Sequence, residues 1–413
     1  LLGTLYGEGY YNPVITVRID GREAADVSPL DVPARIDRID IEVKPGRPFT
    51  FSRAEVTPLA PGTELPEGFR VGETARVGTI QRAAAAGVAG WRALGHAKAE
   101  LTREEIEADH ARDKLSVSLG VAPGPKLRFG PLRVSGNKRV RTERILAIAG
   151  LPEGEVYDPE ELEKAADRLR RTEAFRAVTL RDAETIGPGD LLAIDAELLE
   201  QKRRRLGFGI EVSSNDGLRL NGYWLHRNLF GGAERLRFDL DIENIGVTDR
   251  DNGTDYSVSG QFRVPAIWGP DNDLYVVGRI AREDEPGYLS DTIDLGAGIT
   301  RIFSDTLEGS VGVLYRAGRV EDAFGERDYQ LLGLPVQLTW DTRDDKLDAT
   351  EGFFVRGLVQ PFAGLSGIES GALSTLDART YWALGDRLVL AGRAQLGSLV
   401  GPDPQDAPPD YRF

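Results

Sequence analysis

The sequence contains no cysteine, no methionine and only three histidines. Without cysteine the chain can form no disulfide, no thiol nucleophile and no cysteine-ligated metal site. The histidines His96, His110 and His226 are far apart in the sequence, which argues against a histidine-rich metal centre. We therefore expect neither a metal site nor a cofactor.

Long apolar runs and an excess of positive charge are also missing. The apolar runs are far shorter than the roughly 18 residues that a transmembrane helix needs. The chain carries 51 basic and 66 acidic residues, a formal net charge of −15, which excludes a broadly basic nucleic-acid-binding protein. Its 413 residues are 41% hydrophobic and 28% charged, a composition typical of folded proteins, and at this length we expect roughly two to four domains.

No enzyme motif is present. The sequence lacks Gly-x-Ser-x-Gly, His-Glu-x-x-His and the Walker A pattern. The spaced glycines of GFGIEVSSNDG at 207–217 lie in strand-like sequence without the βαβ unit that nucleotide binding requires. Glu104, Glu105 and Glu107 are expected on the polar face of a helix, where charge runs are normally solvated. The sequence therefore predicts a protein that is not an enzyme and that acts through its surfaces and edges.

The first half contains an internal repeat. VKPGRPFTFSRAEV at 43–56 aligns without a gap with VAPGPKLRFGPLRV at 121–134, an offset of 78 residues. In each copy a strand ends at a Pro-Gly turn, because glycine after proline supplies the positive φ of a type II turn. A third copy of the strand, LLAIDAELLEQKRRRLGF at 191–208, lacks that turn.

Two helices are expected between the first and second strands of each unit. In the third unit, TERILAIAG ends at Gly150, and DPEELEKAADRLRRTEAF has Asp158 as its N-cap and Pro159 at its first position. In the second unit, we place them in residues 73–96 and in the turn region before. The first copy lacks an opening strand and a first helix, and the sequence ends on DYRF in a loop-like stretch. We therefore expect an internal segment of a longer protein.

The second half consists of alternating apolar and polar residues from about residue 203 onward. In LRFDLDIEN at 236–244, Leu236, Phe238, Leu240 and Ile242 lie on one face of a strand, with charged residues on the other. About eleven such strands begin near residues 204, 217, 233, 255, 273, 291, 306, 327, 352, 370 and 386. They are long enough to cross a bilayer, and no helices cover their apolar face. A transmembrane barrel with these four side chains toward lipid is favoured over a soluble sheet.

Several short motifs resemble those of the BamA/TamA-like outer-membrane assembly superfamily. The repeat units resemble POTRA domains, the polypeptide-transport-associated modules of these proteins. NLFGGAERL resembles an NLFG-x-G-E turn, DTRDDKLDATEGFF resembles a D-x-RD…P-x-x-G segment with Ala349 in place of the proline, and the final Arg-Phe resembles the start of an RF-x-x-GG…VRG-aromatic loop. The VRG at 355–357 lies inside a strand and is a chance match. The motif residues are Asn228, Leu229, Phe230, Gly231, Asp341, Arg343, Asp344, Gly352, Arg412 and Phe413.

The resemblance implies an α+β fold of POTRA repeats (β-α-α-β-β) followed by an antiparallel transmembrane β-barrel, incomplete in this chain. Residues 1–46 would be the C-terminal part of a first POTRA, 47–125 a second, 126–202 a third, and 203–413 the first eleven or so of sixteen strands. Three units next to the barrel are most similar to the TamA branch, whereas BamA-type members usually have five.

The same resemblance implies a function. The chain would belong to a non-enzymatic assembly factor in the bacterial outer membrane, with its POTRA domains in the periplasm. Its partners would be unfolded outer-membrane proteins, a TamB-like protein anchored in the inner membrane, and the lipid bilayer, but no nucleic acid. The alternatives are a secretion pore of the two-partner type and a BamA-type assembly subunit.

The first barrel strand is the candidate site of action. Exposed edges of POTRA sheets can pair with an incoming strand, and in this superfamily the first and last barrel strands meet at a weak seam, a lateral gate. Glycine weakens strand pairing, and the resemblance implies a gate formed by Leu206, Gly207, Phe208, Gly209, Ile210 and Val212. The alternative is that the glycines only permit close packing where the third POTRA joins the barrel.

Overall fold

The computed structural model describes residues 1–27, 35–213, 217–246, 253–385 and 387–412. Contacts divide the chain into two compact parts. One contains Leu1–Pro131, Pro152–Leu162 and Asp182–Ile194, and the other contains Leu132–Leu151, Glu163–Arg181 and Asp195–Phe413. Within the described residues, no helix is both long and apolar enough to cross a membrane.

The first repeat unit is a helix followed by a small antiparallel sheet. Helix α1 (Leu2–Gly7) precedes β1 (Val14–Ile19), β2 (Arg22–Glu23), the short 3-10 helix η1 (Ala24–Asp26) and β3 (Ile39–Lys44). The strand order is β2-β1-β3. Gly46, in the turn after β3, has a φ of 78°, and Gly124 has a φ of 68° in the matching turn of the next unit, so both predicted Pro-Gly turns are confirmed.

The second unit packs one helix on a three-stranded sheet. It comprises β4 (Thr50–Thr57), α2 (Val77–Ala93), β5 (Glu100–Asp109) and β6 (Lys114–Ala122), in the order β4-β6-β5. Alternate residues of β6, from Leu115 to Val121, are buried beneath α2 together with Phe51 and Ile80. A Cβ on Gly87 would lie 2.7 Å from Val56, so this glycine lets α2 approach β4 closely.

Two predictions for the second unit are wrong. Its expected first helix is absent, since the stretch between β4 and α2 forms turns, because Pro58, Pro61 and Pro66 restrict the backbone and remove N–H donors. Glu104, Glu105 and Glu107 lie on strand β5 rather than on a helix. β5 is an edge strand of the sheet, where charged side chains stay in water on both faces.

The third unit has the predicted order of strand, two helices and two strands. It comprises β7 (Arg128–Ser135), α3 (Thr142–Ala149), α4 (Pro159–Arg171), β8 (Phe175–Asp182), the 3-10 turn η2 (Pro188–Asp190) and β9 (Leu191–Glu200). Its sheet order, β7-β9-β8, repeats that of the second unit. The predicted caps are confirmed, because Asp158 Oδ1 accepts the N–H of Glu160 at 2.9 Å and Gly150 ends α3 with a φ of 59°.

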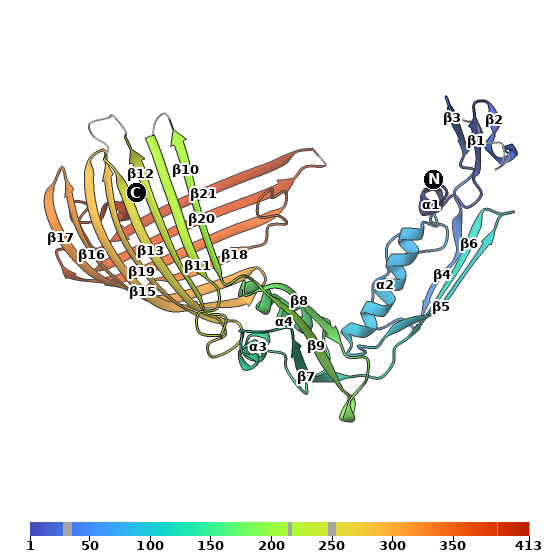
Figure 1. Cartoon of the computed structure of the whole chain (residues 1–413), viewed down its shortest axis with the longest axis horizontal. Coiled ribbons are helices and arrows are strands. Elements are labelled where there is room, and N and C mark those ends of the chain that lie inside the picture. The colour runs from blue at the N-terminus through green and yellow to red at the C-terminus, as the bar shows by residue number, and fades with distance from the viewer. Residues whose placement is uncertain (28–34, 214–216, 247–252, 386, 413) are drawn as a thin grey trace. The chain divides into compact units, whose positions relative to one another are not determined.

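The second half forms one curved antiparallel sheet of 12 strands (Figure 1). The strands are β10 (Arg204–Ser213), β11 (Gly217–His226), β12 (Arg235–Ile245), β13 (Asp255–Val264), β14 (Asn272–Glu285), β15 (Tyr288–Ser304), β16 (Leu307–Asp322), β17 (Gly325–Gly333), β18 (Val336–Asp341), β19 (Gly352–Ser366), β20 (Gly371–Ala383) and β21 (Val389–Val400). A 3-10 turn, η3 (Pro409–Tyr411), follows. Strands that follow each other in sequence pair with each other, except that β17 and β18 both lie between β16 and β19. β10 and β21 are the edges of the described sheet.

One of the expected strands is split in two. The strand predicted to begin near residue 327 appears as β17 and β18, which both pair with β16. Pro335 lies between them and has no N–H, while Leu334 donates its N–H to the carbonyl of Pro361 on β19 at 2.9 Å. The proline therefore interrupts the hydrogen bonding to β16, but the chain continues in the same direction beside it.

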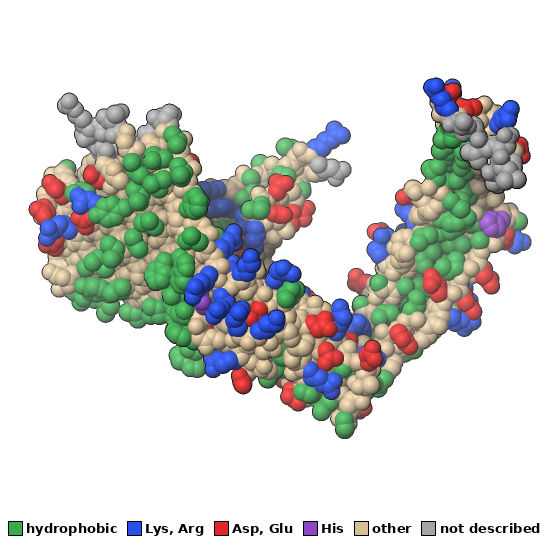
Figure 2. All heavy atoms as spheres, in the orientation of Figure 1, with side chains coloured by type: hydrophobic (Ala, Val, Ile, Leu, Met, Phe, Trp, Pro, Cys, Tyr) green, Lys and Arg blue, Asp and Glu red, His purple; other side chains and the backbone are tan. Residues whose placement is uncertain are grey.

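The two faces of the sheet differ as the alternation predicted. On β12, Phe238 and Leu240 are exposed on the outer face, whereas Arg237 and Asp239 pair with each other on the inner face at 2.7 Å. Further along the inner face, Arg316 pairs with Asp294 at 2.6 Å. Figure 2 shows hydrophobic side chains over much of the outer face that it presents. The sheet thus has an apolar outside and a polar inside.

Candidate functional site

Strand β10 forms one edge of the 12-stranded sheet. It pairs with β11 along its whole length, from Arg204 opposite His226 to Ser213 opposite Gly217, and with no other strand of the described residues. Its outward side chains are among the most exposed hydrophobic residues of the sheet: Leu206 at 74%, Phe208 at 84%, Ile210 at 67% and Val212 at 79%. On the side away from β11, the strand therefore presents a sheet edge beside an apolar surface.

The glycines of β10 face the inside of the sheet. A Cβ on Gly207 would collide with the ring of Tyr223, and one on Gly209 would lie 2.7 Å from Asn221 Oδ1. The ring of Tyr223 also lies against the guanidinium groups of Arg205 and Arg237, at 5.7 and 4.6 Å. Both glycines thus make room for inner side chains of β11, and their nearest neighbours are not residues of the third unit.

The NLFGGAE motif is a turn that satisfies its own polar groups. The buried carboxylate of Glu234 accepts the N–H groups of Phe230 and Gly232, both at 2.9 Å. The amide oxygen of Asn228 accepts the N–H of Ala233 at 3.0 Å, and Leu229 donates its N–H to the carbonyl of Glu234 at 3.1 Å. Glu234 was not among the predicted site residues, although its place in the motif could have indicated it.

This turn contacts helix α3 of the third unit. The carbonyl of Gly231, which has a φ of 88°, accepts the N–H of Arg141 at 2.8 Å. Arg144 donates to the carbonyl of Pro265 in the next turn of the sheet at 2.5 Å. Val140, Ala233 and Ala266 belong to one buried hydrophobic cluster. The motif therefore supports the third unit against the sheet.

A second turn, residues 265–271, is held by helix α4. Arg168 makes two hydrogen bonds of 2.8 Å to the carboxylate of Asp271 and a third, of 3.1 Å, to the carbonyl of Ala149. Burial raises the pKa of Asp271, but the hydrogen bonds and charges of Arg168 and Arg171 outweigh it, so the net pKa is lowered. A Cβ on Gly150 would lie 2.5 Å from Pro270, which shows how closely the helix and the turn approach.

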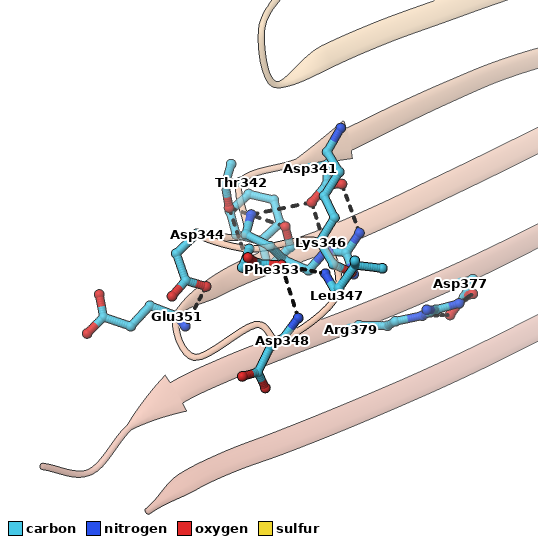
Figure 3. A network of polar contacts seen from close by, with 12 residues as sticks. Asp341, Thr342, Asp344, Lys346, Leu347, Asp348, Glu351, Phe353, Asp377 and Arg379 are labelled. Carbon is cyan, nitrogen blue, oxygen red and sulfur yellow. Dashed lines mark hydrogen bonds and ion pairs between the residues drawn. The ribbon is translucent and has the colours of Figure 1, made fainter. Parts of the chain in front are cut away.

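The D-x-RD motif builds a third turn, between β18 and β19 (Figure 3). Asp341 binds the guanidinium of Arg343 at 2.8 and 2.9 Å. Asp344 accepts the hydroxyl of Thr350 at 2.6 Å and the N–H of Glu351 at 3.1 Å. These hydrogen bonds, that of Thr350 first, hold the pKa of Asp344 below its ordinary value.

Gly352 closes this turn. Its φ is 96°, and a Cβ there would collide with the carbonyl oxygen of Thr342. Any other residue would therefore displace the turn or strain its backbone. Ala349, which replaces the more common proline, leaves the hydrogen bonds around Asp344 formed.

Arginine side chains line the inner wall beside this turn. The guanidinium groups of Arg343, Arg356 and Arg379 surround the ring of Phe354 at 5.1, 5.3 and 5.1 Å. A cleft of about 670 Å³ is lined by Arg343 and Arg356 on this wall and by Arg171 at the end of helix α4. This wall is polar enough to stay hydrated.

The segment after β21 folds back onto the inner wall. Tyr411 is buried against Phe362 and accepts a hydrogen bond from Gln360 at 2.6 Å. Arg412 pairs with Asp322 at 3.1 Å. Phe413 lies outside the described residues.

The motif residues therefore lie in three places rather than in one site. The residues of the NLFG motif form the turn beneath α3, those of the D-x-RD motif form the turn after β18, and Arg412 lies on the inner wall at the far end of β16. The residues of the predicted gate lie together on β10, with the apolar side chains on its outer side and the two glycines on its inner side.

Comparisons with known proteins agree with this arrangement. Residues 205–413 match the Omp85 superfamily domain, and residues 127–195 match the POTRA family described as a surface antigen variable number repeat. The outer membrane protein assembly factor BamA of Nitratidesulfovibrio vulgaris is 23% identical over 340 residues, which cover 77% of this chain and 40% of that protein. The chain thus spans well under half of this relative.

Two solved structures share the fold. BamA from Haemophilus ducreyi lacking POTRA domains 1-3 superimposes with a TM-score of 0.61 at 13% identity, covering 86% of this chain and 71% of the other. CdiB from Escherichia coli superimposes with a TM-score of 0.50 at 12% identity, covering 86% of this chain and 69% of the other. None of these three proteins is a TamA, so the TamA branch stays a prediction from the number of repeat units.

Proposed function

Because the chain belongs to the Omp85 superfamily, we propose that it helps outer-membrane proteins to fold and insert, and that client strands enter the membrane at the edge formed by β10. Proteins of this superfamily reside in the outer membrane with their POTRA domains in the periplasm, and this chain has the same location. The 12-stranded sheet is part of a membrane barrel, and its turns beside the third unit face the periplasm.

The single observation that carries the proposal is the edge of β10. Among the described residues, the ten-residue strand β10 pairs with a strand on its β11 side alone, and four exposed apolar side chains lie beside its other edge. In hydrocarbon an unpaired N–H or C=O is costly, so a client strand that pairs with this edge would enter the membrane with its backbone satisfied. The predicted gate, Leu206 to Val212, is this strand.

The domain division is part of the same proposal. We assign residues 1–46 to part of a first POTRA, 47–125 and 126–202 to two further POTRA units, and 203–413 to the barrel. In the second unit, β5 is an edge strand, and β8 has the same place in the third. Such edges can receive an unfolded client by strand addition, without sequence specificity and without catalysis.

The curated relative favours assembly over secretion, since its name is that of an assembly factor. We further propose a TamA-type role with a TamB-like partner. This part of the proposal depends on the assignment of three POTRA units next to the barrel. A secretion pore of the two-partner type is the competing function, in which the substrate would pass through the lumen rather than the wall.

A cross-link between β10 and the last barrel strand of the full-length protein tests the proposal. Because the chain has no native cysteine, an engineered cysteine at Ile210 is the only thiol on this segment. Locking this seam should stop insertion of client barrels while leaving the barrel folded. A matched control joins Ile210 to Leu220, its partner on β11, and should leave insertion unchanged. Full insertion by the locked protein would refute the gate and favour the secretion pore.

A further inference from the structure

Five cations lie exposed at the periplasmic end of β10. They are the side chains of Lys138, Arg139, Lys202, Arg203 and Arg204, which we call the basic foot. None of them lies within 4.0 Å of a carboxylate in the part of the chain that the structure describes, whereas most other arginines of the barrel are paired. The basic foot thus gathers five cations without a directly paired carboxylate on an acidic protein.

The nearest carboxylates are already occupied. Glu200, at the end of β9, accepts the N–H groups of Lys138, Arg139 and Val140 at 2.7, 2.7 and 2.9 Å. This contact joins two segments about 60 residues apart, and one oxygen of the Glu200 carboxylate accepts all three backbone N–H groups. Glu173 is shared by Arg227 and Arg235, at 3.6 and 2.7 Å. Glu173 therefore has its own arginine partners. Glu200 attracts the charge of Arg139 but forms no ion pair with a side chain of the foot within 4.0 Å in the described chain.

The position of the basic foot coincides with the membrane boundary. Arg204 shares the outward face of β10 with Leu206 and Phe208, because side chains alternate along a strand. Exposed aromatic residues lie in or beside the turns at this same end of the sheet: Phe230, Trp268, Phe303, Trp340 and Trp382. Aromatic belts mark the level of the lipid headgroups in barrels.

Figure 2 shows how charged and hydrophobic side chains are distributed on one face of the molecule. Lys and Arg side chains gather where the strands end beside the third unit, below the hydrophobic outer surface. The five cations are all exposed and lie along the boundary. A bilayer surface presents many phosphate groups side by side, whereas free phosphate in solution is dilute. An open row of cations is therefore better matched to a bilayer surface than to a single dissolved anion.

We propose that the basic foot binds the phosphate groups of anionic phospholipids in the periplasmic leaflet of the outer membrane. Basic side chains next to a membrane segment are attracted to anionic lipid, and arginine binds phosphate in a bidentate manner. Lipid binding here would fix the lower end of β10 at the bilayer surface. The inference depends only on the membrane barrel and not on the proposed gate.

The test measures which lipids contact the full-length protein. The protein is reconstituted in bilayers of phosphatidylethanolamine with a minor share of phosphatidylglycerol, and electron spin resonance compares spin-labelled phosphatidylglycerol with spin-labelled phosphatidylcholine at the protein surface. The wild type should prefer phosphatidylglycerol. The variant K202S/R203S/R204S should lose this preference by about threefold or more, and added salt should weaken it in the wild type.

Matched variants separate the basic foot from total charge. R18S/R22S/R47S removes three exposed arginines that also have no acidic partner among the described residues, and it should keep the wild-type preference. R203K/R204K keeps the charge and should keep most of the preference. If the triple serine variant does not fold, as judged by heat-modifiable migration, R203S and R204S alone should each lower the preference.

Three results would overturn the proposal. Equal loss of preference in R18S/R22S/R47S would show that net charge, not this site, selects the lipid. Displacement of the labelled lipid by inorganic phosphate at constant ionic strength would show a general anion site. An unchanged preference in folded K202S/R203S/R204S would likewise reject the basic foot as the lipid site, whatever the outcome of the gate experiment.

Discussion

Replacement of Arg168 by alanine should loosen the third unit from the barrel turn at 265–271. The guanidinium is 9% exposed and makes two hydrogen bonds of 2.8 Å to Asp271, whose side chain is 31% exposed. Loss of one partner of a fully buried pair costs about 3–5 kcal/mol. Because Asp271 can recover part of its hydration and keeps Arg171 at 3.4 Å, we expect about 2–3 kcal/mol.

Native-state hydrogen exchange on the full-length protein measures this loss. Amides of α3 and α4 should exchange faster in R168A by the factor that corresponds to the lost free energy, while amides of the distant strands keep their rates. R170A is the control, since Arg170 pairs with Glu163 and Asp167 at a surface where such pairs contribute within about 0.5 kcal/mol. Equal protection in R168A and R170A would refute the reasoning.

The same contact predicts a pH dependence. The pKa of Asp271 is lowered in the folded protein, so its contribution to stability is complete above the ordinary aspartate range and is lost as the pH falls through the folded pKa. Protection of α4 should therefore decrease as the pH falls below about 4. In D271N, the amides of α4 should be less protected from hydrogen exchange at neutral pH, and this protection should not decrease further as the pH falls.

Two further predictions concern the sheet. F238R places a charge on the exposed apolar face beside Gly260 and should destabilise the folded barrel in bilayers by about 2–4 kcal/mol. Equilibrium unfolding from lipid vesicles measures this loss. Stability equal to the wild type would show that this face does not contact lipid. G207V forces a side chain into the ring of Tyr223 and should lower the free energy of unfolding by about 1–3 kcal/mol in the same assay. The double variant G207V/Y223A should recover part of this stability. No recovery would show that the glycine acts through its backbone freedom alone.

The sequence predicts what is local and misses what is distant. Alternation along LRFDLDIEN indicated the strand and its two faces, because each side chain's direction follows from its neighbours. The caps of α3 and α4 were predicted for the same reason. The missing helix before α2 could have been foreseen, since three prolines lie in that stretch.

The contacts that hold the third unit could not have been predicted in this way. Arg168 and Asp271 are 103 residues apart, and neither belongs to a motif. Arg141 and Gly231 are 90 residues apart, and only the glycine lies in a recognisable pattern. Such pairs depend on how a helix packs against a turn, which no short stretch of sequence encodes.

The contacts of β10 indicate which of its two edges a client would use under the proposed function. On one side β10 pairs with β11 through ten residues, and the ring of Tyr223 fills the space above Gly207. At its lower end, Arg227 donates its N–H to the carbonyl of Arg203 at 2.8 Å and its guanidinium to that of Lys202 at 3.2 Å. A client that displaced β11 would break all of these contacts, whereas one that added to the free edge would break none of those in the described chain. Strand addition therefore needs the seam opposite β11 to open, and this is why locking Ile210 to Leu220 should leave insertion intact while locking β10 to the last strand should stop it.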